Sequence, residues 1–416
     1  MPSGPDPHRP PPRPSRARPL AIVASVVGFV VVLAVLASSG GLIGPQPSPS
    51  PNQPTPAGPS AVAGGETSQP SASPTPIESP SPTTSPTSSI PPLPAFDGPH
   101  LVATREELRA LPTSGAAWRA LKDWAGRSAH PDISDQTDDA DLVVLAKALV
   151  YGRTHSASVR KQALTIIRAA VGTERGGRTL ALARNLAGYV IAADLIELAD
   201  LDPAFDRDVF RPWLKDVLGK NLDGATLRST QEDRPNNWGT HAGAARAAVA
   251  LYLGDATELD RVATVFRGWL GDRTAYTGFS WGNEAWQCDQ SAPVGINPVG
   301  CKRAGHSIDG VLPDDQRRAG GFRWPPPKEN YVWEALQGAT LEAELLTRAG
   351  YPAWDWSDKA LLRAATWLYR VDHYPAQGDD SWLPWLIDRR YGTSFHGSAP
   401  STPGKNFGFT DWLYRR

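Results

Sequence analysis

The sequence predicts an all-α domain of layered or toroidal architecture, placed after an N-terminal apolar segment and a proline-rich linker. Prolines divide the 416 residues, because 24 of the 41 lie within residues 1–19 and 45–94. All 15 tryptophans lie after residue 95, so the side chains able to build a large core are confined to the C-terminal block. Apolar residues in this block recur at helical spacing, and convincing alternation of period two is absent.

The N-terminal segment predicts a membrane anchor. Four arginines and one acidic residue precede an 18-residue apolar run from Leu20 to Ala37. As a helix the run is about 27 Å long, close to the hydrocarbon thickness of a bilayer. The basic flank places residues 1–19 in the cytoplasm. A signal-peptide core is usually shorter, so we expect residues 20–38 to stay as a single-pass anchor in the cell membrane with an extracellular C-terminal domain. Cleavage near Ala34 to Ser39 would instead give a secreted protein.

Residues 39–95 predict a disordered linker rich in proline, serine and threonine. Between Pro45 and Pro94 the only charged residues are Glu66 and Glu78. Such a segment lacks the apolar area that would offset its ordering entropy. An extended stalk of this kind lets a tethered domain sample a thick cell wall, and a plain spacer fits the same composition.

The charge of the block, residues 96–416, narrows its partners. It carries 38 basic and 40 acidic residues, so no overall positive field exists to hold nucleic acid or an anionic membrane surface. An acidic ligand must therefore be met by a few placed cations in a cleft. The sequence leaves the oligomeric state open.

The expected helices run through the block in order. Thr104 and Glu107 predict a capping box at the first helix. Apolar residues at helical spacing predict further helices over Asp141–Tyr151, Val159–Val171, Ala181–Leu198, Phe210–Leu218, His241–Leu253, Leu259–Leu270, Tyr331–Arg348 and Trp356–Val371. The segment Thr274–Asn330 interrupts this regularity, and its length is typical of a functional loop.

The two cysteines, Cys288 and Cys301, lie inside that long segment. Export to an oxidising compartment predicts a disulfide between them. The eight histidines show no cluster with metal-ligand spacing, so we expect neither a metal nor another cofactor.

Two stretches, Arg234–Asp255 and Asp309–Trp354, resemble the alginate lyase type of polysaccharide lyase. That family shows an Asn-Asn pair at the head of a helix, here Asn236 and Asn237. It then shows Asp-Gly-x-Leu-Pro-x-Glu-x-x-Arg, followed by a tyrosine that begins a helix. The resemblance implies an α/α toroid, an incomplete helical barrel of about ten or more helices, over residues 96–416. It also implies a carbon-oxygen lyase that cleaves a uronate-containing polysaccharide.

Within the second motif, Asp309 and Arg318 match the family, Asp315 stands for the glutamate, and Tyr331 takes the tyrosine position. Two departures bear on the substrate. Trp238 follows the Asn-Asn pair where characterised alginate lyases have histidine, and residues 320–328 lengthen the spacing from the arginine to the tyrosine.

The chemistry of uronate elimination explains these residue types. The proton on C5 becomes acidic once the neighbouring carboxylate is neutralised, a task suited to the amide of Asn237 and the guanidinium of Arg318. Tyr331 then serves as general base and acid, provided that a cation such as Arg318 favours its phenolate. His241, four residues after Asn237, is a candidate for the missing imidazole or a second base.

Further residues are candidates for substrate binding through amide, cationic or stacking contacts: Asn236, Trp238, Arg184, Arg323, Trp324 and Trp333. Each candidate also has a structural interpretation. The asparagines can cap the helix, Tyr331 can pack at a helix start, Arg318 and His241 can be solvated, and tryptophans are more often core. The adjacent acids Asp314 and Asp315 fit an anchor for an arginine.

Two other functions remain open. An inverting glycoside hydrolase on a similar α/α toroid would need two carboxylates about 6.5 to 9.5 Å apart. Asp309, Asp314, Glu284 and Glu334 are the candidates, and no spacing singles out a pair. A catalytically silent wall protein that binds polysaccharide is the third function, and Trp238 at the histidine position favours it.

Overall fold

The structure, a computed structural model, describes Leu93 and residues 97–415. The predicted cytoplasmic tail, the predicted anchor and nearly all of the predicted linker lie outside these residues. Within the described part of the chain, no helix is long and apolar enough to cross a membrane. The described residues belong to the unit Thr84–Arg416, and the fold is that of this unit.

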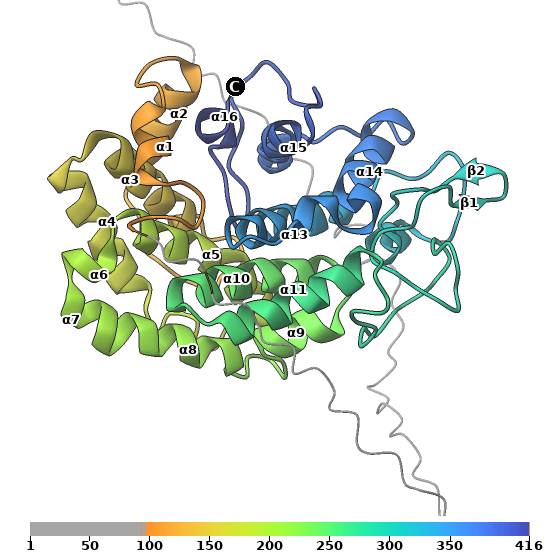
Figure 1. Cartoon of the computed structure of the whole chain (residues 1–416), viewed down its shortest axis with the longest axis horizontal. Coiled ribbons are helices and arrows are strands. Elements are labelled where there is room, and N and C mark those ends of the chain that lie inside the picture. Colours follow the sequence, from red (N-terminus) through yellow and green to blue (C-terminus); the bar gives the residue numbers. More distant parts are fainter. Residues whose placement is uncertain (1–92, 94–96, 416) are drawn as a thin grey trace, which may run out of the picture. The chain divides into compact units, whose positions relative to one another are not determined.

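The described residues are mostly helical, as the sequence predicts, with about fifteen helices and one small two-stranded sheet (Figure 1). The helices are α1 (Arg105–Ala110), α2 (Ala116–Ala125), α3 (Ala140–Thr154), α4 (Ala157–Ala170), α5 (Thr179–Leu195), α6 (Leu198–Leu201), α7 (Pro203–Phe205), α8 (Arg211–Gly219), α9 (Leu227–Asp233), α10 (Asn237–Leu253), α11 (Ala256–Leu270), α12 (Pro313–Gln316), α13 (Tyr331–Arg348), α14 (Trp356–Arg370), α15 (Leu383–Tyr391) and α16 (Thr410–Leu413).

Four helices form the inner layer and pack in the order α3, α5, α10, α13. Helices α3, α5 and α10 are buried almost all round, since their sequences are apolar on nearly every face and rich in alanine. A side chain at Gly338 of α13 would collide with the backbone of Thr240 in α10, and one at Gly243 would collide with Glu342. Both contacts advance along the two helices together, so α10 and α13 run in the same direction. Their N-termini therefore open on the same side of the domain.

The remaining long helices cover this layer and connect its members. Helix α4 packs on α3 and α5, while α9 and α11 pack on α10. These outer helices bury only one stripe, as α4 does with Ala163, Ile166, Ile167 and Ala170. That spacing of three and four residues is the amphipathic signal from which the sequence predicts α4 and α11.

The predicted helices are present with ends shifted by a few residues. The capping box at Thr104 and Glu107 is confirmed, with each side chain bonded to the other residue's backbone N–H. Helices α2, α9 and α15 were not expected. The sequence of α9, LRSTQED, is almost wholly polar, so its only strong signal is the second capping box that Thr226 forms with Ser229.

The segment Thr274–Asn330 is irregular, as expected, and joins α11 to α13. It contains the antiparallel strands β1 (Lys302–Arg303) and β2 (His306–Ser307), then α12 and the 3-10 helix η2 (Arg317–Ala319). Cys288 and Cys301 form a disulfide, which confirms the predicted pairing, with their Cα atoms 5.8 Å apart. This covalent link closes a loop within the segment, and Cys301 directly precedes β1.

Candidate active site

The two motifs of the sequence meet at the N-terminus of α10. Asn236 is the N-cap residue, and its Oδ1 accepts from the backbone N–H of Trp238 at 3.1 Å. Its Nδ2 donates to Asp314 Oδ2 at 3.0 Å, while the backbone N–H of Asn237 donates to Asp315 Oδ1 at 3.1 Å. The capping role therefore belongs to Asn236. The side chain of Asn237 is left for another task.

Asp314 and Asp315 are buried anchors in this arrangement. Oδ1 of Asp314 also accepts a hydrogen bond from Nε of Arg317 at 2.7 Å, which is the predicted pairing with an arginine. Burial and the charge of Asp314 raise the pKa of Asp315 well above its usual value, and the hydrogen bond from Asn237 only partly offsets them. Asp309 is held elsewhere, by Arg363 Nη1 at 2.8 Å. Gly310 follows it with φ +83°, against the backbone of Arg363, so this position of the turn requires glycine.

Arg318 joins Asn237 to Tyr331. Nη2 of Arg318 lies 3.4 Å from Asn237 Oδ1, and its Cζ lies 4.0 Å from the centroid of the Tyr331 ring. Tyr331 is the first residue of α13 and is 41% exposed. Three of the four predicted catalytic residues are thus brought together, from α10, η2 and α13. Residues 320–328, which lengthen the spacing, form the connection between η2 and α13.

His241, the fourth predicted residue, lies one turn deeper on α10 and is fully buried. Its Nε2 is 3.6 Å from Glu334 Oε2, and Arg184 Nη2 of α5 lies 3.0 Å from the same oxygen. Burial lowers the pKa of His241. Burial also opposes ionisation of Glu334, but His241 and Arg184 hold the pKa of Glu334 below its usual value. Glu334 is three residues after Tyr331, so the two side chains lie on the same face of α13. Glu334 thus connects the exposed tyrosine to the buried His241 of α10.

Asn406 is a member of this cluster that the sequence did not suggest. Its Nδ2 donates to the carbonyl of Ala183 at 2.9 Å, which turns Oδ1 toward Nδ1 of His241. An amide oxygen only accepts, so Nδ1 of His241 must carry a proton in this contact. Asn406 has φ +72° in a loop 165 residues away from His241 along the chain. No local pattern marks a single asparagine in such a loop.

The other predicted binding residues are dispersed. Arg323 is exposed, and Trp324 stacks on His306 with ring centroids 4.2 Å apart. Trp333 is 1% exposed and its indole N–H donates to the carbonyl of Tyr374, which places it in the core and gives a sugar no exposed ring face. Trp238 is partly buried, with the guanidinium groups of Arg178 and Arg234 over its ring.

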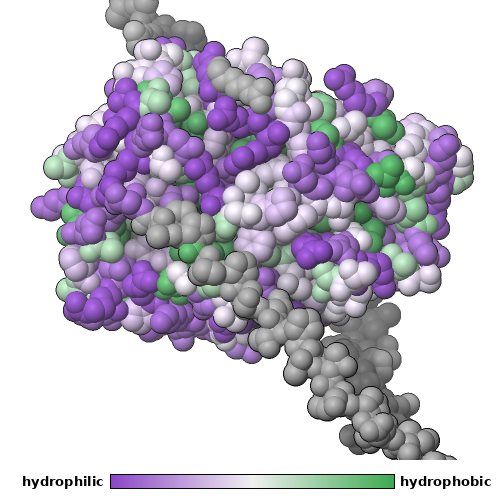
Figure 2. Space-filling view, viewed as in Figure 1, coloured by the Kyte–Doolittle hydropathy of each residue, from purple (hydrophilic) through white to green (hydrophobic). Residues whose placement is uncertain are grey.

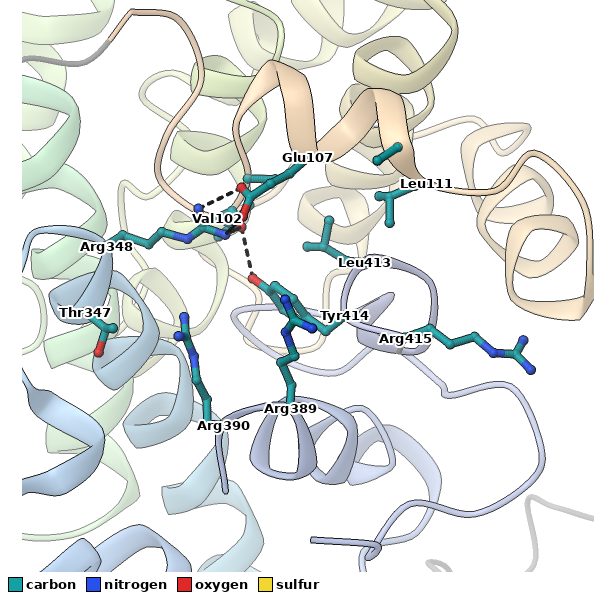
Figure 3. Close-up of a pocket in the computed structure, with 12 residues that line it drawn as sticks. Val102, Glu107, Leu111, Thr347, Arg348, Arg389, Arg390, Leu413, Tyr414 and Arg415 are labelled. Atoms are coloured by element: carbon teal, nitrogen blue, oxygen red, sulfur yellow. Dashed lines mark hydrogen bonds and ion pairs between the residues drawn. The ribbon is translucent and has the colours of Figure 1, made fainter. Parts of the chain in front are cut away.

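The surface and cavities add two facts about the site. Figure 2 shows apolar residues scattered among hydrophilic ones on one face of the domain. Among the described residues, Tyr331 is one of only three large hydrophobic side chains that are exposed. A cavity of about 480 Å³ lies between the ends of α1, α13, α15 and α16, lined by Arg348, Arg389 and Arg390 (Figure 3). None of the predicted site residues lines it. Residues 97–415 contain no group of three or more potential ligands able to hold a metal ion.

A helical domain that brings together an amide, a guanidinium and a phenol, with the amide buried and the phenol exposed, has the groups that a polysaccharide lyase needs. Residues 143–281 match the family model described as alginate lyase. The matched segment holds the Asn236–His241 stretch and stops before Arg318 and Tyr331, which the fold brings to it. The predicted resemblance is thus confirmed over these residues, and the family implies polysaccharide lyase activity on a uronate polysaccharide. A search of the curated proteins finds no match.

Proposed function

We propose that this protein is a membrane-anchored extracellular polysaccharide lyase that cleaves a uronate-containing polysaccharide by β-elimination. The observation that carries the proposal is the meeting of Asn237, Arg318 and Tyr331 through contacts of 3.4 and 4.0 Å. Asn237 lies 81 positions before Arg318, and the three residues have no shared structural task, because Asn236 already caps α10. An exposed tyrosine beneath an arginine is poorly explained as core packing.

In the proposed reaction, Asn237 and Arg318 bind the carboxylate of the sugar unit whose C5–H bond breaks. Their hydrogen bonds stabilise the negative charge that develops on this carboxylate as the proton leaves. Tyr331, as phenolate, takes the C5 proton, and the electron pair of that bond forms the C4–C5 double bond while the C4–O bond breaks. The proton on Tyr331 then passes to the departing oxygen. Tyr331 ends as it began, and no water is consumed.

Arg318 suits both tasks because of its position over the tyrosine ring. A guanidinium keeps its charge throughout the accessible pH range, so it favours the phenolate and the substrate carboxylate alike. The buried His241 and Glu334 position Tyr331 without contacting the substrate. With Arg184 they form a packed polar cluster that fixes the first turn of α13 and hence the place of Tyr331.

The proposed architecture is an incomplete α/α toroid. It is supported by the alternation of the inner helices with outer helices along the chain and by the parallel course of α10 and α13. The N-termini of α10 and α13 lie on one side of the domain, and the exposed Tyr331 is the first residue of α13. Residues 20–38 are proposed as the anchor. Membrane fractionation should find the intact chain with the membranes, and a soluble chain that lacks its first 40 or so residues would favour the secreted form.

The alternatives have less support from the geometry. For an inverting hydrolase, the carboxylates of Asp309 and Asp314 are already paired with Arg363 and Arg317. Glu334 is paired with Arg184. For a silent binding protein, Trp238 replaces the family histidine, but Tyr331 and its arginine are both retained.

The test is a screen of the purified full-length chain on polymannuronate, polyguluronate and polyglucuronate. Elimination alone creates the conjugated double bond, which absorbs in the ultraviolet, whereas hydrolysis creates reducing ends without it. Ultraviolet-absorbing product supports the proposal. Reducing ends without absorbance would indicate the hydrolase, and binding without product would indicate the wall protein.

A further inference from the structure

Two exposed arginines flank the tryptophan that follows the candidate catalytic asparagine. The Cζ atoms of Arg178 and Arg234 lie 4.8 and 4.5 Å from the centroid of the Trp238 ring. Arg178 is the N-cap residue of α5, and Arg234 is the residue at which α9 ends. The sequence does not point to this pair, because the two arginines are 56 positions apart and only Arg234 lies in a stretch that resembles the family.

The two positive charges are only weakly compensated. Their guanidinium carbons are at most about 9 Å apart, close enough to repel one another. Arg178 pairs with Asp223 at 3.1 Å, but both side chains are more than half exposed, and pairs of this kind contribute little. Arg234 has no carboxylate within ion-pair distance among the described residues. Its chain neighbour Asp233 accepts instead from the hydroxyl of Ser280.

The backbone adds to this positive field. Helices α5 and α10 are each 17 residues long, pack against one another, and begin at Thr179 and Asn237. The N-terminus of a helix carries a partial positive charge, and here two such ends adjoin the two arginines. The ring of Trp238 holds both guanidinium groups in place through cation-π contacts.

We propose that Arg178, Trp238 and Arg234 form a carboxylate-binding subsite for the uronate unit that adjoins the reacting one on the side away from the bond that breaks. This inference rests on the proposed function, and it assigns the two arginines to chain positions of the polymer outside the reacting unit. Trp238 directly follows Asn237, so the subsite adjoins the proposed catalytic group. The tryptophan acts as the support for the two cations.

The inference predicts a length-dependent effect on binding. In the full-length chain, the double variant Arg178→Ala/Arg234→Ala should raise KM for the polymer about tenfold to a hundredfold, the value of one or two charge-assisted hydrogen bonds. Its kcat should change little, because the reacting unit keeps Asn237, Arg318 and Tyr331. The shortest cleavable oligouronate, which cannot reach the subsite, should show an unchanged KM. Lysine at both positions should restore part of the affinity.

The matched control removes two exposed arginines elsewhere, Arg168 and Arg207, each paired with one aspartate. This control lowers the net charge equally and should leave KM as in the parent. An equal KM for both double variants, or a rise that is independent of oligomer length, would overturn the subsite.

Binding of each polyuronate, measured by calorimetry, separates this inference from the proposed function. One outcome is that the parent chain binds a polyuronate without ultraviolet-absorbing product and that the Arg178→Ala/Arg234→Ala variant loses this binding. That result would support the subsite and refute the lyase activity. If the parent chain forms the product and the variant binds the polymer as tightly as the parent, the lyase activity is supported and the subsite is refuted. Failure of the parent chain to bind any polyuronate would overturn both.

Discussion

Replacement of Tyr331 by phenylalanine removes one oxygen atom from the proposed active site and leaves the fold unchanged. The side chain is 41% exposed, and among the described residues no hydrogen-bond partner is found for its hydroxyl. The phenylalanine ring also keeps a face for the guanidinium of Arg318, now 4.0 Å from the ring centroid. The free energy of unfolding should therefore change by less than about 0.5 kcal/mol.

Activity should respond quite differently, because the lost hydroxyl is the only group proposed to accept and return the proton. Loss of general acid-base catalysis lowers kcat by about 10² to 10⁴. The assay is the initial rate of double-bond formation on the best polyuronate, with binding measured in parallel. Tyr351→Phe is the control, since its hydroxyl makes only a 3.5 Å contact with Asp260. If Tyr331→Phe kept the parent kcat, the assignment of the base would be wrong and a carboxylate-based mechanism would take its place.

The remaining predictions concern the cap, a buried acid and the disulfide. Asn236→Ala should cost about 1 kcal/mol of stability through loss of the α10 cap. Asn237→Ala should instead lower kcat by about 10² to 10³, as loss of an oxyanion-type donor does. Equal effects of the two substitutions on melting temperature and turnover would refute this division of roles. Asp141 is buried without a hydrogen-bond partner for its carboxylate among the described residues, and burial raises its pKa to about 7 from 3.8, against the opposing charge of Lys405. The native state then holds a proton that the unfolded state has lost, so this stabilisation is present at low pH and disappears as the pH rises through 7. Asp141→Asn should remove that dependence and stabilise the chain by about 2 to 4 kcal/mol near pH 8, as read from denaturant titrations at both ends of the range. Reduction of Cys288–Cys301 should cost roughly 3 kcal/mol, and an unchanged melting temperature after complete reduction would show that the segment holds its conformation without the bond.

The helices were predictable where burial leaves a periodic trace in the sequence. The amphipathic α4 and the apolar α10 both carry such a trace, and Gly254 ends α10 in the left-handed conformation that glycine favours. Helix α9 carries none, because its polar sequence is held by contacts with α10 and by its capping box. The parallel course of α10 and α13 depends on close approach at Gly243 and Gly338, which only the packed structure reveals.

The candidate site was predictable only in part, for a similar reason. Asn237, Arg318 and Tyr331 stand in recognisable motifs, so their residue types and spacing carry the chemistry. The contributions of Glu334 and Asn406 come from proximity across α5, α10 and α13 to residues far away in the chain. Sequence spacing also did not separate the roles of the two asparagines. The hydrogen bond from Trp238 to Asn236 does so.

Trp238 stands where the family has a histidine, and this replacement changes which side chains supply positive charge next to the candidate active site. An imidazole next to the Asn-Asn pair would be cationic only below its pKa, so its contribution to the binding of a carboxylate would vary near neutral pH. In this chain the imidazole of His241 lies one turn deeper, where burial lowers its pKa and Asn406 fixes the proton on Nδ1. The ring of Trp238 instead supports two guanidinium groups, whose charge does not titrate in this range. Under the proposed function, affinity for the acidic polymer then stays nearly constant around neutral pH.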